Sequence, residues 1–69
     1  MFAAELRRLR LAAKLTQEQV AASARVSREY VSMLEAGKNI PTIDVFIRLC
    51  RAVGVSPAEV ITRLEKAKK

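Results

Sequence analysis

The sequence predicts an all-α protein, a compact five-helix bundle in one domain that spans residues 1–69. Apolar residues recur at intervals of three and four, the period of a helix with one buried face. Ser or Thr stands before several of these segments, where it can cap a helix N-terminus. Glycine follows two of them, where a helix end often turns left-handed. We expect helices at about 2–13, 17–24, 28–36, 42–53 and 57–66.

The first predicted helix carries one apolar stripe. Its members are Phe2, Leu6, Leu9 and Ala13, spaced by four, three and four residues. A basic amphipathic helix lying on a membrane would show a similar pattern. Because the segment is short and a small core needs the same apolar face, we favour a place in the bundle.

Two short helices joined by a tight turn follow. Thr16 can cap the first, with Gln19 completing a capping box, and Ser27 can cap the second. Helices of about two turns do not persist alone, so their apolar residues must close over a shared core. Those residues are Val20, Ala21, Ala24, Val31 and Leu34.

The second of these helices keeps a mixed polar face that points away from the core. That face consists of Arg28, Glu29, Ser32 and Met33. A short, rigidly held helix with such a face is the element that enters a DNA major groove.

The last two helices complete the core. The fourth can be capped by Thr42 and is stopped by Gly54, and its buried stripe should hold Phe46, Leu49, Cys50 and Val53. The fifth can be capped by Ser56, and proline stands in its first turn. It offers more apolar surface than so small a core needs, which favours a homodimer interface. The residues of that interface would be Pro57, Ile61 and Leu64.

Composition favours DNA as a partner and argues against catalysis. Thirteen Lys and Arg against seven Asp and Glu give a net charge of +6, which suits a polyanion such as nucleic acid. A merely soluble basic surface is the alternative. The chain has no His and one Cys, so neither an intrachain zinc site nor a His-activated nucleophile can form. We expect no enzyme activity, no metal and no cofactor.

The single cysteine and the apolar segments indicate a cytoplasmic protein. Cys50 cannot form an intrachain disulfide, which fits a reducing compartment. A place in the core is a better explanation for it than a redox switch. The N-terminus lacks the apolar run of a signal peptide, and no stretch approaches membrane-spanning length.

Several short motifs carry a family resemblance. They are LTQE at 15–18 followed by Ala21, VSR at 26–28, YVS at 30–32, LE-x-G at 34–37, PT at 41–42 and GVS at 54–56. Over residues 6–61 the chain resembles the Cro and phage-repressor type of helix-turn-helix domain, also called the xenobiotic-response-element or lambda-repressor-like type. Segment 28–32 is similar to small stand-alone regulators, including restriction–modification controller proteins.

The resemblance implies a sequence-specific transcriptional regulator that binds double-stranded DNA. A homodimer would read a palindromic operator with helix 28–36 in the major groove. Arg28, Glu29, Ser32 and Met33 match the base-reading positions. Arg28 can donate twice to guanine. Glu29 either accepts from cytosine or holds Arg28 in place, and Met33 either packs on a thymine methyl or is partly buried beside Leu34.

We expect six residues to contact the DNA backbone, and the resemblance itself implies this role for Gln17. The six are Thr16, Gln17, Ser27, Tyr30, Lys38 and Asn39. Gln17 begins its helix, where the side-chain amide and the terminal N–H groups can donate to phosphate. Thr16 is a cap first and a phosphate neighbour second. Tyr30 either reaches the DNA backbone with its hydroxyl or packs against the first helix.

Two scaffold features follow from the same resemblance. Arg10 and Glu35 are expected to form a partly buried ion pair that fixes the angle of helix 28–36. Arg25 stands in the turn where the family usually has Gly or Asn with positive φ. Because a non-Gly residue there costs roughly 1 kcal/mol, either the turn is strained or its backbone differs. Arg25 could reach phosphate or stay in solvent.

Two rival functions are compatible with the sequence. A protein-binding module of the same fold, an antitoxin or an adaptor, is one, because fold alone does not fix function. Glu29 and Met33 would suit such a surface, whereas Arg28 and Ser32 in basic surroundings favour DNA. A general nucleoid-type binder is the other, and it would bind DNA regardless of sequence.

Overall fold

Five helices make up the described chain. The structure is a computed structural model that describes residues 2–67. The helices are α1 (Phe2–Ala12), α2 (Gln17–Ala24), α3 (Arg28–Glu35), α4 (Ile43–Ala52) and α5 (Pro57–Ala67). The all-α prediction is therefore confirmed. Some predicted bounds included cap residues, since Thr42 caps the start of α4 while Ala36 and Val53 cap the ends of α3 and α4.

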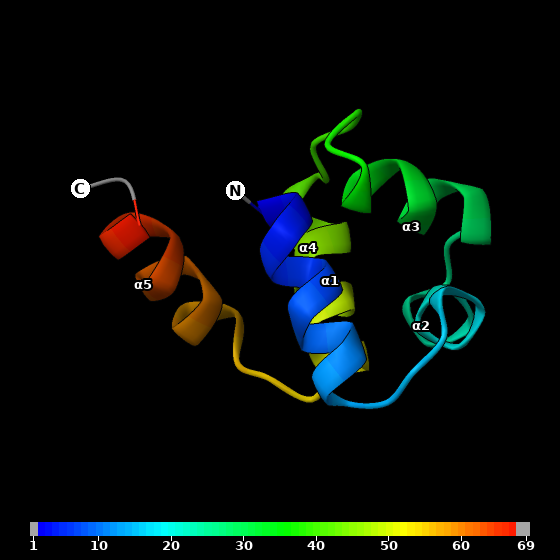
Figure 1. The fold of residues 1–69 in the computed structure, drawn as a ribbon, viewed down its shortest axis with the longest axis horizontal. Helices are drawn as coiled ribbons and strands as arrows, with labels where there is room; N and C mark the ends of the chain where they lie inside the picture. Colours follow the sequence, from blue (N-terminus) through cyan, green and yellow to red (C-terminus); the bar gives the residue numbers. More distant parts are fainter. Residues whose placement is uncertain (1, 68–69) are drawn as a thin grey trace.

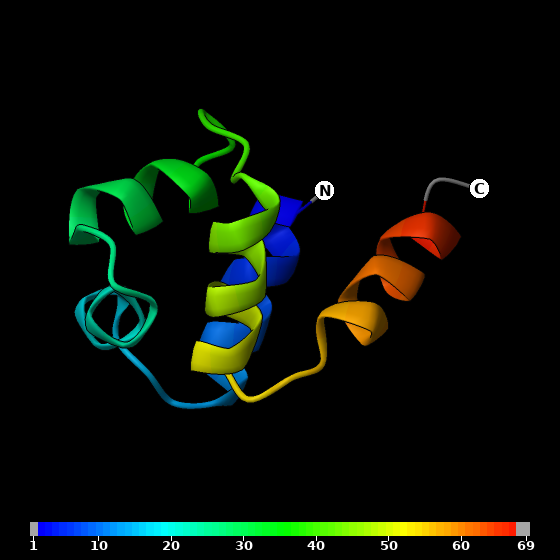
Figure 2. The same ribbon diagram turned by 180° about the vertical axis from the view of Figure 1, so that it is seen from behind.

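Helix α4 lies between α2 and α5. Helix α2 packs against both α3 and α4, α1 packs against α3, and α5 packs against α4. Helices α2 and α3 lie on one side of the molecule and α5 on the other, as both ribbon views show (Figures 1 and 2). None of the helices within residues 2–67 is long and apolar enough to cross a membrane.

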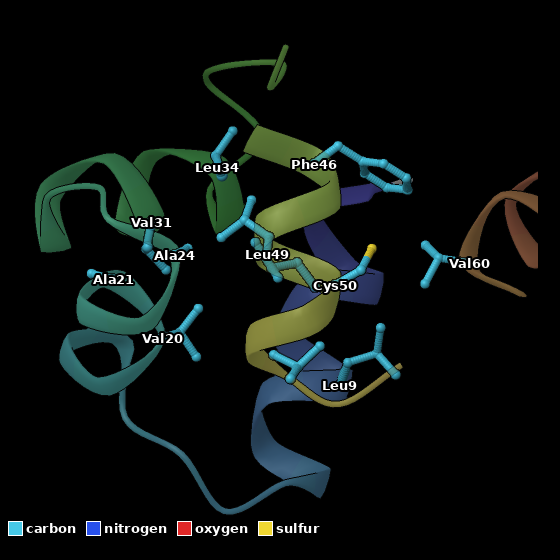
Figure 3. Close-up of a cluster of buried hydrophobic side chains, with 12 residues drawn as sticks. Leu9, Val20, Ala21, Ala24, Val31, Leu34, Phe46, Leu49, Cys50 and Val60 are labelled. Atoms are coloured by element: carbon cyan, nitrogen blue, oxygen red, sulfur yellow. The ribbon is translucent and has the colours of Figure 1, made fainter. Parts of the chain in front are cut away.

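The core is formed by the stripes that the helical periodicity predicts. Figure 3 shows side chains from α2, α3 and α4 converging, with Leu9 of α1 and Val60 of α5 completing the cluster. The buried residues are Leu6, Leu9, Val20, Ala21, Ala24, Val31, Leu34, Phe46, Leu49, Cys50, Val53 and Val60. Phe2 packs edge-on against Phe46 with 5.3 Å between ring centroids. Ala13, predicted to continue the first stripe, is exposed because α1 ends at Ala12.

Side-chain caps start the helices of the central motif. The Thr16 hydroxyl accepts from the Gln19 backbone N–H at 3.0 Å, and the Gln19 side chain accepts from the Thr16 N–H at 2.9 Å. This is the predicted capping box. Ser27 accepts from the Tyr30 backbone N–H at 3.0 Å at the start of α3. Such caps satisfy N–H groups that a helix start would leave without partners.

Helices α1 to α4 all end in the same pair of crossed backbone hydrogen bonds. At the end of α3 the Gly37 N–H donates to Leu34 and the Lys38 N–H donates to Met33, and Gly37 has a φ of +77°. This closure requires a left-handed residue. Gly54 provides it after α4 with a φ of +79°.

After α1 and α2 the left-handed residue carries a side chain. Lys14 has a φ of +59° and Arg25 a φ of +61°. The Val26 N–H donates to Ala21 at 3.0 Å, so the turn at Arg25 has the same crossed bonds as the glycine ends. Of the two alternatives for this turn, the left-handed conformation is therefore the one adopted. The second such position, Lys14, was not predicted from the sequence.

Replacing Arg25 by glycine is expected to stabilise the protein by about 0.5–1 kcal/mol. The left-handed conformation costs a residue with a Cβ about 1–2 kcal/mol, and the greater backbone entropy that glycine loses on folding offsets part of this gain. Arg25→Ala is the matched control, because alanine removes the guanidinium but keeps the Cβ. Urea unfolding of the three proteins measures the effect. A glycine variant no more stable than the alanine variant would show that the turn stores no strain.

Candidate nucleic-acid interface

Helix α3 presents a polar face to solvent while its opposite face is fully buried. Val31 and Leu34 are buried in the core. Arg28 and Glu29 are exposed, Ser32 is half-buried, and Met33 is 41% exposed. Within residues 2–67 no side-chain hydrogen bond joins Glu29 to Arg28. Met33 lies on the outward face, next to the buried Leu34 but not covered by the core.

The orientation of α3 is fixed at its last residue by an ion pair to α1. Arg10 Nε donates to Glu35 Oε2 at 2.7 Å, and Arg10 Nη2 donates to Glu35 Oε1 at 3.0 Å. The two side chains are only 11% and 5% exposed. Two parallel bonds between a planar guanidinium and a carboxylate are strongly directional. The pair therefore restrains both the distance and the rotation of α3 relative to α1.

Two further bonds extend this ion pair to α2. Arg10 Nη1 donates to the Leu15 carbonyl at 2.9 Å, in the connection between α1 and α2. Gln17 Nε2 donates to Glu35 Oε1 at 3.1 Å. We refer to Arg10, Leu15, Gln17 and Glu35 as the Glu35 network. It joins three helices that are separate in the sequence.

The charge state of Glu35 is set by competing effects. Burial by itself would raise the pKa of the carboxyl, because it disfavours the charged form. Hydrogen bonds from Arg10 and Gln17 and the charges of Arg10 and Arg7 outweigh burial, so the pKa of Glu35 lies below its ordinary value. The hydrogen bonds to Glu35 in turn raise the pKa of Arg10. Both partners are charged at neutral pH.

Gln17 was predicted to contact DNA phosphate, and the structure places its amide on Glu35 instead of in open solvent. An amide nitrogen has two N–H donors, and the contact with Glu35 uses one of them. The other remains available beside the start of α2. Sequence reasoning missed the Gln17–Glu35 bond, because the two residues are 18 positions apart.

The other residues assigned to the DNA backbone lie around the central motif. Thr16 and Ser27 are exposed caps. Tyr30 is half-buried against the core cluster. Lys38 is exposed, and its backbone N–H closes the end of α3. Asn39 is half-buried in a small pocket that Phe2 of α1 also lines.

Arg48 of α4 also positions the motif, and the sequence analysis did not identify it. Its Nε donates to the Ala24 carbonyl at 2.8 Å. A cation near the end of a helix stabilises its last carbonyls. The bond ties the end of α2 to α4, just before the turn at Arg25. The sequence gives no local signal for this bond, because nothing distinguishes Arg48 from other charged residues of a helix.

Apolar side chains remain exposed between the start of α4 and α5. Ile40 is 91% exposed, Ile43 66% and Ile61 44%. We call this region the apolar surface, and it is lined by Phe2, Ile40, Pro41, Ile43, Phe46, Ile61 and Leu64. Two of the predicted interface residues, Ile61 and Leu64, belong to it. Pro57 is half-buried and does not line it.

The described residues contain neither a cluster of metal-binding side chains nor an activated thiol. Within residues 2–67 no three His, Cys, Asp or Glu side chains gather closely enough to hold a metal ion. Cys50 is buried, and burial raises the pKa of its thiol. A thiol with a raised pKa is a poor nucleophile at neutral pH.

Comparisons with known proteins agree with this architecture. A family model described as a helix-turn-helix domain matches residues 1–67. The uncharacterised HTH-type transcriptional regulator y4dJ of Sinorhizobium fredii is 44% identical over 55 residues, which cover 80% of this chain and 71% of that protein.

Solved structures show the same fold. The restriction-modification controller protein C.AhdI from Aeromonas hydrophila has a TM-score of 0.81 and 33% identity, with 84% of this chain and 88% of that chain covered. An XRE-family like protein from Pseudomonas syringae pv. tomato has a TM-score of 0.86 and 27% identity, with 97% and 82% covered.

Proposed function

The chain belongs to the helix-turn-helix family of the Cro and xenobiotic-response-element type, and we propose that it binds a palindromic operator as a homodimer with α3 in the major groove. Membership makes it a DNA-binding transcriptional regulator. The operator, the dimer and the assigned contacts are our proposal. We also propose that the protein is cytoplasmic and meets its DNA there. The relative from Sinorhizobium fredii and the controller protein from Aeromonas hydrophila support the regulatory role.

The observation that carries the proposal is the outward face of α3. Arg28 and Glu29 lie exposed in its first turn, with Ser32 and Met33 one turn later. The recognition helix of this class reads base edges with its N-terminal residues. Arg28 can donate two hydrogen bonds to guanine O6 and N7, and Met33 can pack on a thymine methyl. Glu29 can accept from cytosine N4.

Contacts to the DNA backbone are proposed on either side of this face. The free N–H groups at the start of α2 and the second amide N–H of Gln17 can donate to one phosphate. Thr16 and Ser27 lie at the starts of α2 and α3, and Lys38 follows the end of α3. Asn39 and the Tyr30 hydroxyl complete the proposed set. The net charge of +6 favours approach to the phosphates.

The apolar surface supports assembly into a dimer. One recognition helix touches few base pairs, so two copies are needed to read a useful site. Large exposed apolar patches mark interaction surfaces, and here Ile40, Ile43 and Ile61 are all exposed. We propose that Ile61 and Leu64 of α5 meet their counterparts in a second copy. Pro57 would lie at the edge of this contact.

Disrupting the apolar surface should produce a monomer. Ile61→Asp places a charge in the proposed interface, and a buried unpaired charge is strongly unfavourable. We expect wild type to sediment as a dimer at micromolar concentration and Ile61→Asp to sediment as a monomer that is still folded. Thr62→Asp, which adds the same charge at the next exposed position of α5, is the control. If wild type is itself monomeric without DNA, the proposed dimer is wrong.

Mutants of α3 and α2 should fail on DNA in different ways. A cognate duplex is first selected from a random pool. Arg28→Ala should then lose about 1–3 kcal/mol on that duplex and relax preference at one base pair per half-site. Gln17→Ala should weaken cognate and scrambled duplexes by similar factors, because a phosphate carries no sequence information. Arg10 still holds Glu35 by two hydrogen bonds in this variant, so α3 should keep its orientation. Competition titrations of the three proteins measure both effects.

The outcomes separate the proposal from its rivals. Equal weakening of both duplexes by Arg28→Ala would show that Arg28 is not a base reader. If selection enriches no sequence but DNA still binds, the protein is a general nucleoid-type binder. If no duplex binds, a protein-binding module such as an antitoxin or adaptor becomes the better explanation.

A further inference from the structure

A shallow groove runs between α1 and the last turn of α3. Arg7 and Leu11 of α1 line one side, and Glu35 and Ala36 line the other. Ala36 follows Met33 by three positions, so it lies about one helical turn further along the same side of α3. The groove is therefore continuous with the outward face of α3. Figure 1 shows this end of α3 beside the N-terminal half of α1.

Two neighbouring arginines on α1 differ in what they contact. The Arg8 guanidinium lies 2.8 Å from Glu5, and Glu5 also lies 3.5 Å from Arg63 of α5. Arg8 lines the groove as well, but its charge is paired. Arg7 is exposed, and its side chain forms no hydrogen bond or ion pair within the described part of the chain. Arg7 precedes Arg10 by one helical turn, on the side of α1 that faces α3.

Arg7 lies near Glu35 but forms no hydrogen bond with it. The carboxylate already accepts two hydrogen bonds from Arg10 and one from Gln17. Arg7 is nevertheless close enough for its charge to contribute to lowering the pKa of Glu35. Arg7 and Gln17 thus lie near the same carboxylate, one on α1 and one at the start of α2. Each has unused donors.

We propose that Arg7 binds a DNA backbone phosphate beside the one proposed for Gln17. The inference rests on the proposed DNA-binding function and extends its contact surface from α2 and α3 to α1. A guanidinium presents a planar fork of donors that matches two oxygens of one phosphate. Arg7 and Glu35 line the same groove, and Gln17 donates to Glu35, so a strand held at Gln17 would lie close to Arg7. Arg7 adds affinity there without reading sequence.

Salt dependence of binding tests the proposal, because each phosphate contact contributes about 0.9 to the slope of log K against log salt. Arg7→Ala should lower that slope by about 0.9 on cognate and scrambled duplexes alike. Affinity would then fall between 50 and 200 mM salt by a factor about 3.5 smaller than for wild type. Arg7→Lys should keep the slope, because it keeps the charge.

Arg8→Ala is the matched control, since it removes one exposed positive charge from the adjacent position. We expect it to leave the slope within error of wild type. If Arg7→Ala and Arg8→Ala lower the slope equally, only net charge matters and the Arg7 contact is wrong. An unchanged slope in Arg7→Ala overturns it too. If wild type binds no duplex, the proposed function fails first, which is a different result from specific binding with an unaffected Arg7 variant.

Discussion

The buried carboxylate of Glu35 is the constraint on which the geometry of this protein depends. It receives Arg10 from α1 and Gln17 from α2, at distances between 2.7 and 3.1 Å. Burying a carboxylate is costly unless it is paired and hydrogen-bonded. Arrangements that separate Arg10 from Glu35 leave that cost uncompensated. The relative positions of three short helices are therefore specified by charge, where apolar packing alone would tolerate small rotations.

This constraint matters because α3 is too short to be stable by itself. It has eight residues, and isolated helices need about 12–15 residues to persist in water. The Ser27 hydroxyl accepts from a backbone N–H of its first turn, while the Gly37 closure and Glu35 fix its last turn. The outward side chains are thus presented from a backbone that is ordered before any partner arrives. Such preorganisation lowers the entropy cost of binding.

Local sequence was sufficient for the helices and the core, and insufficient for contacts between helices. Periodicity and capping residues predicted the five helices, because each of these signals involves residues only a few positions apart in the sequence. The Gln17–Glu35 and Arg48–Ala24 bonds join positions 18 and 24 apart, and only the folded geometry brings them together. The left-handed Lys14 was missed because no glycine marks it. The Arg10–Glu35 contact was expected from family resemblance and not from the pattern of residues.

A double-mutant cycle on the unfolding free energy tests the central role of this ion pair most directly. Arg10→Gln, Glu35→Gln and the double variant are compared with wild type by urea unfolding. If the pair holds α1 to α3, the loss in the double variant is smaller than the sum of the two single losses, by at least about 1 kcal/mol. Losses that add, with a coupling near zero, would mean that apolar packing alone sets the position of α3.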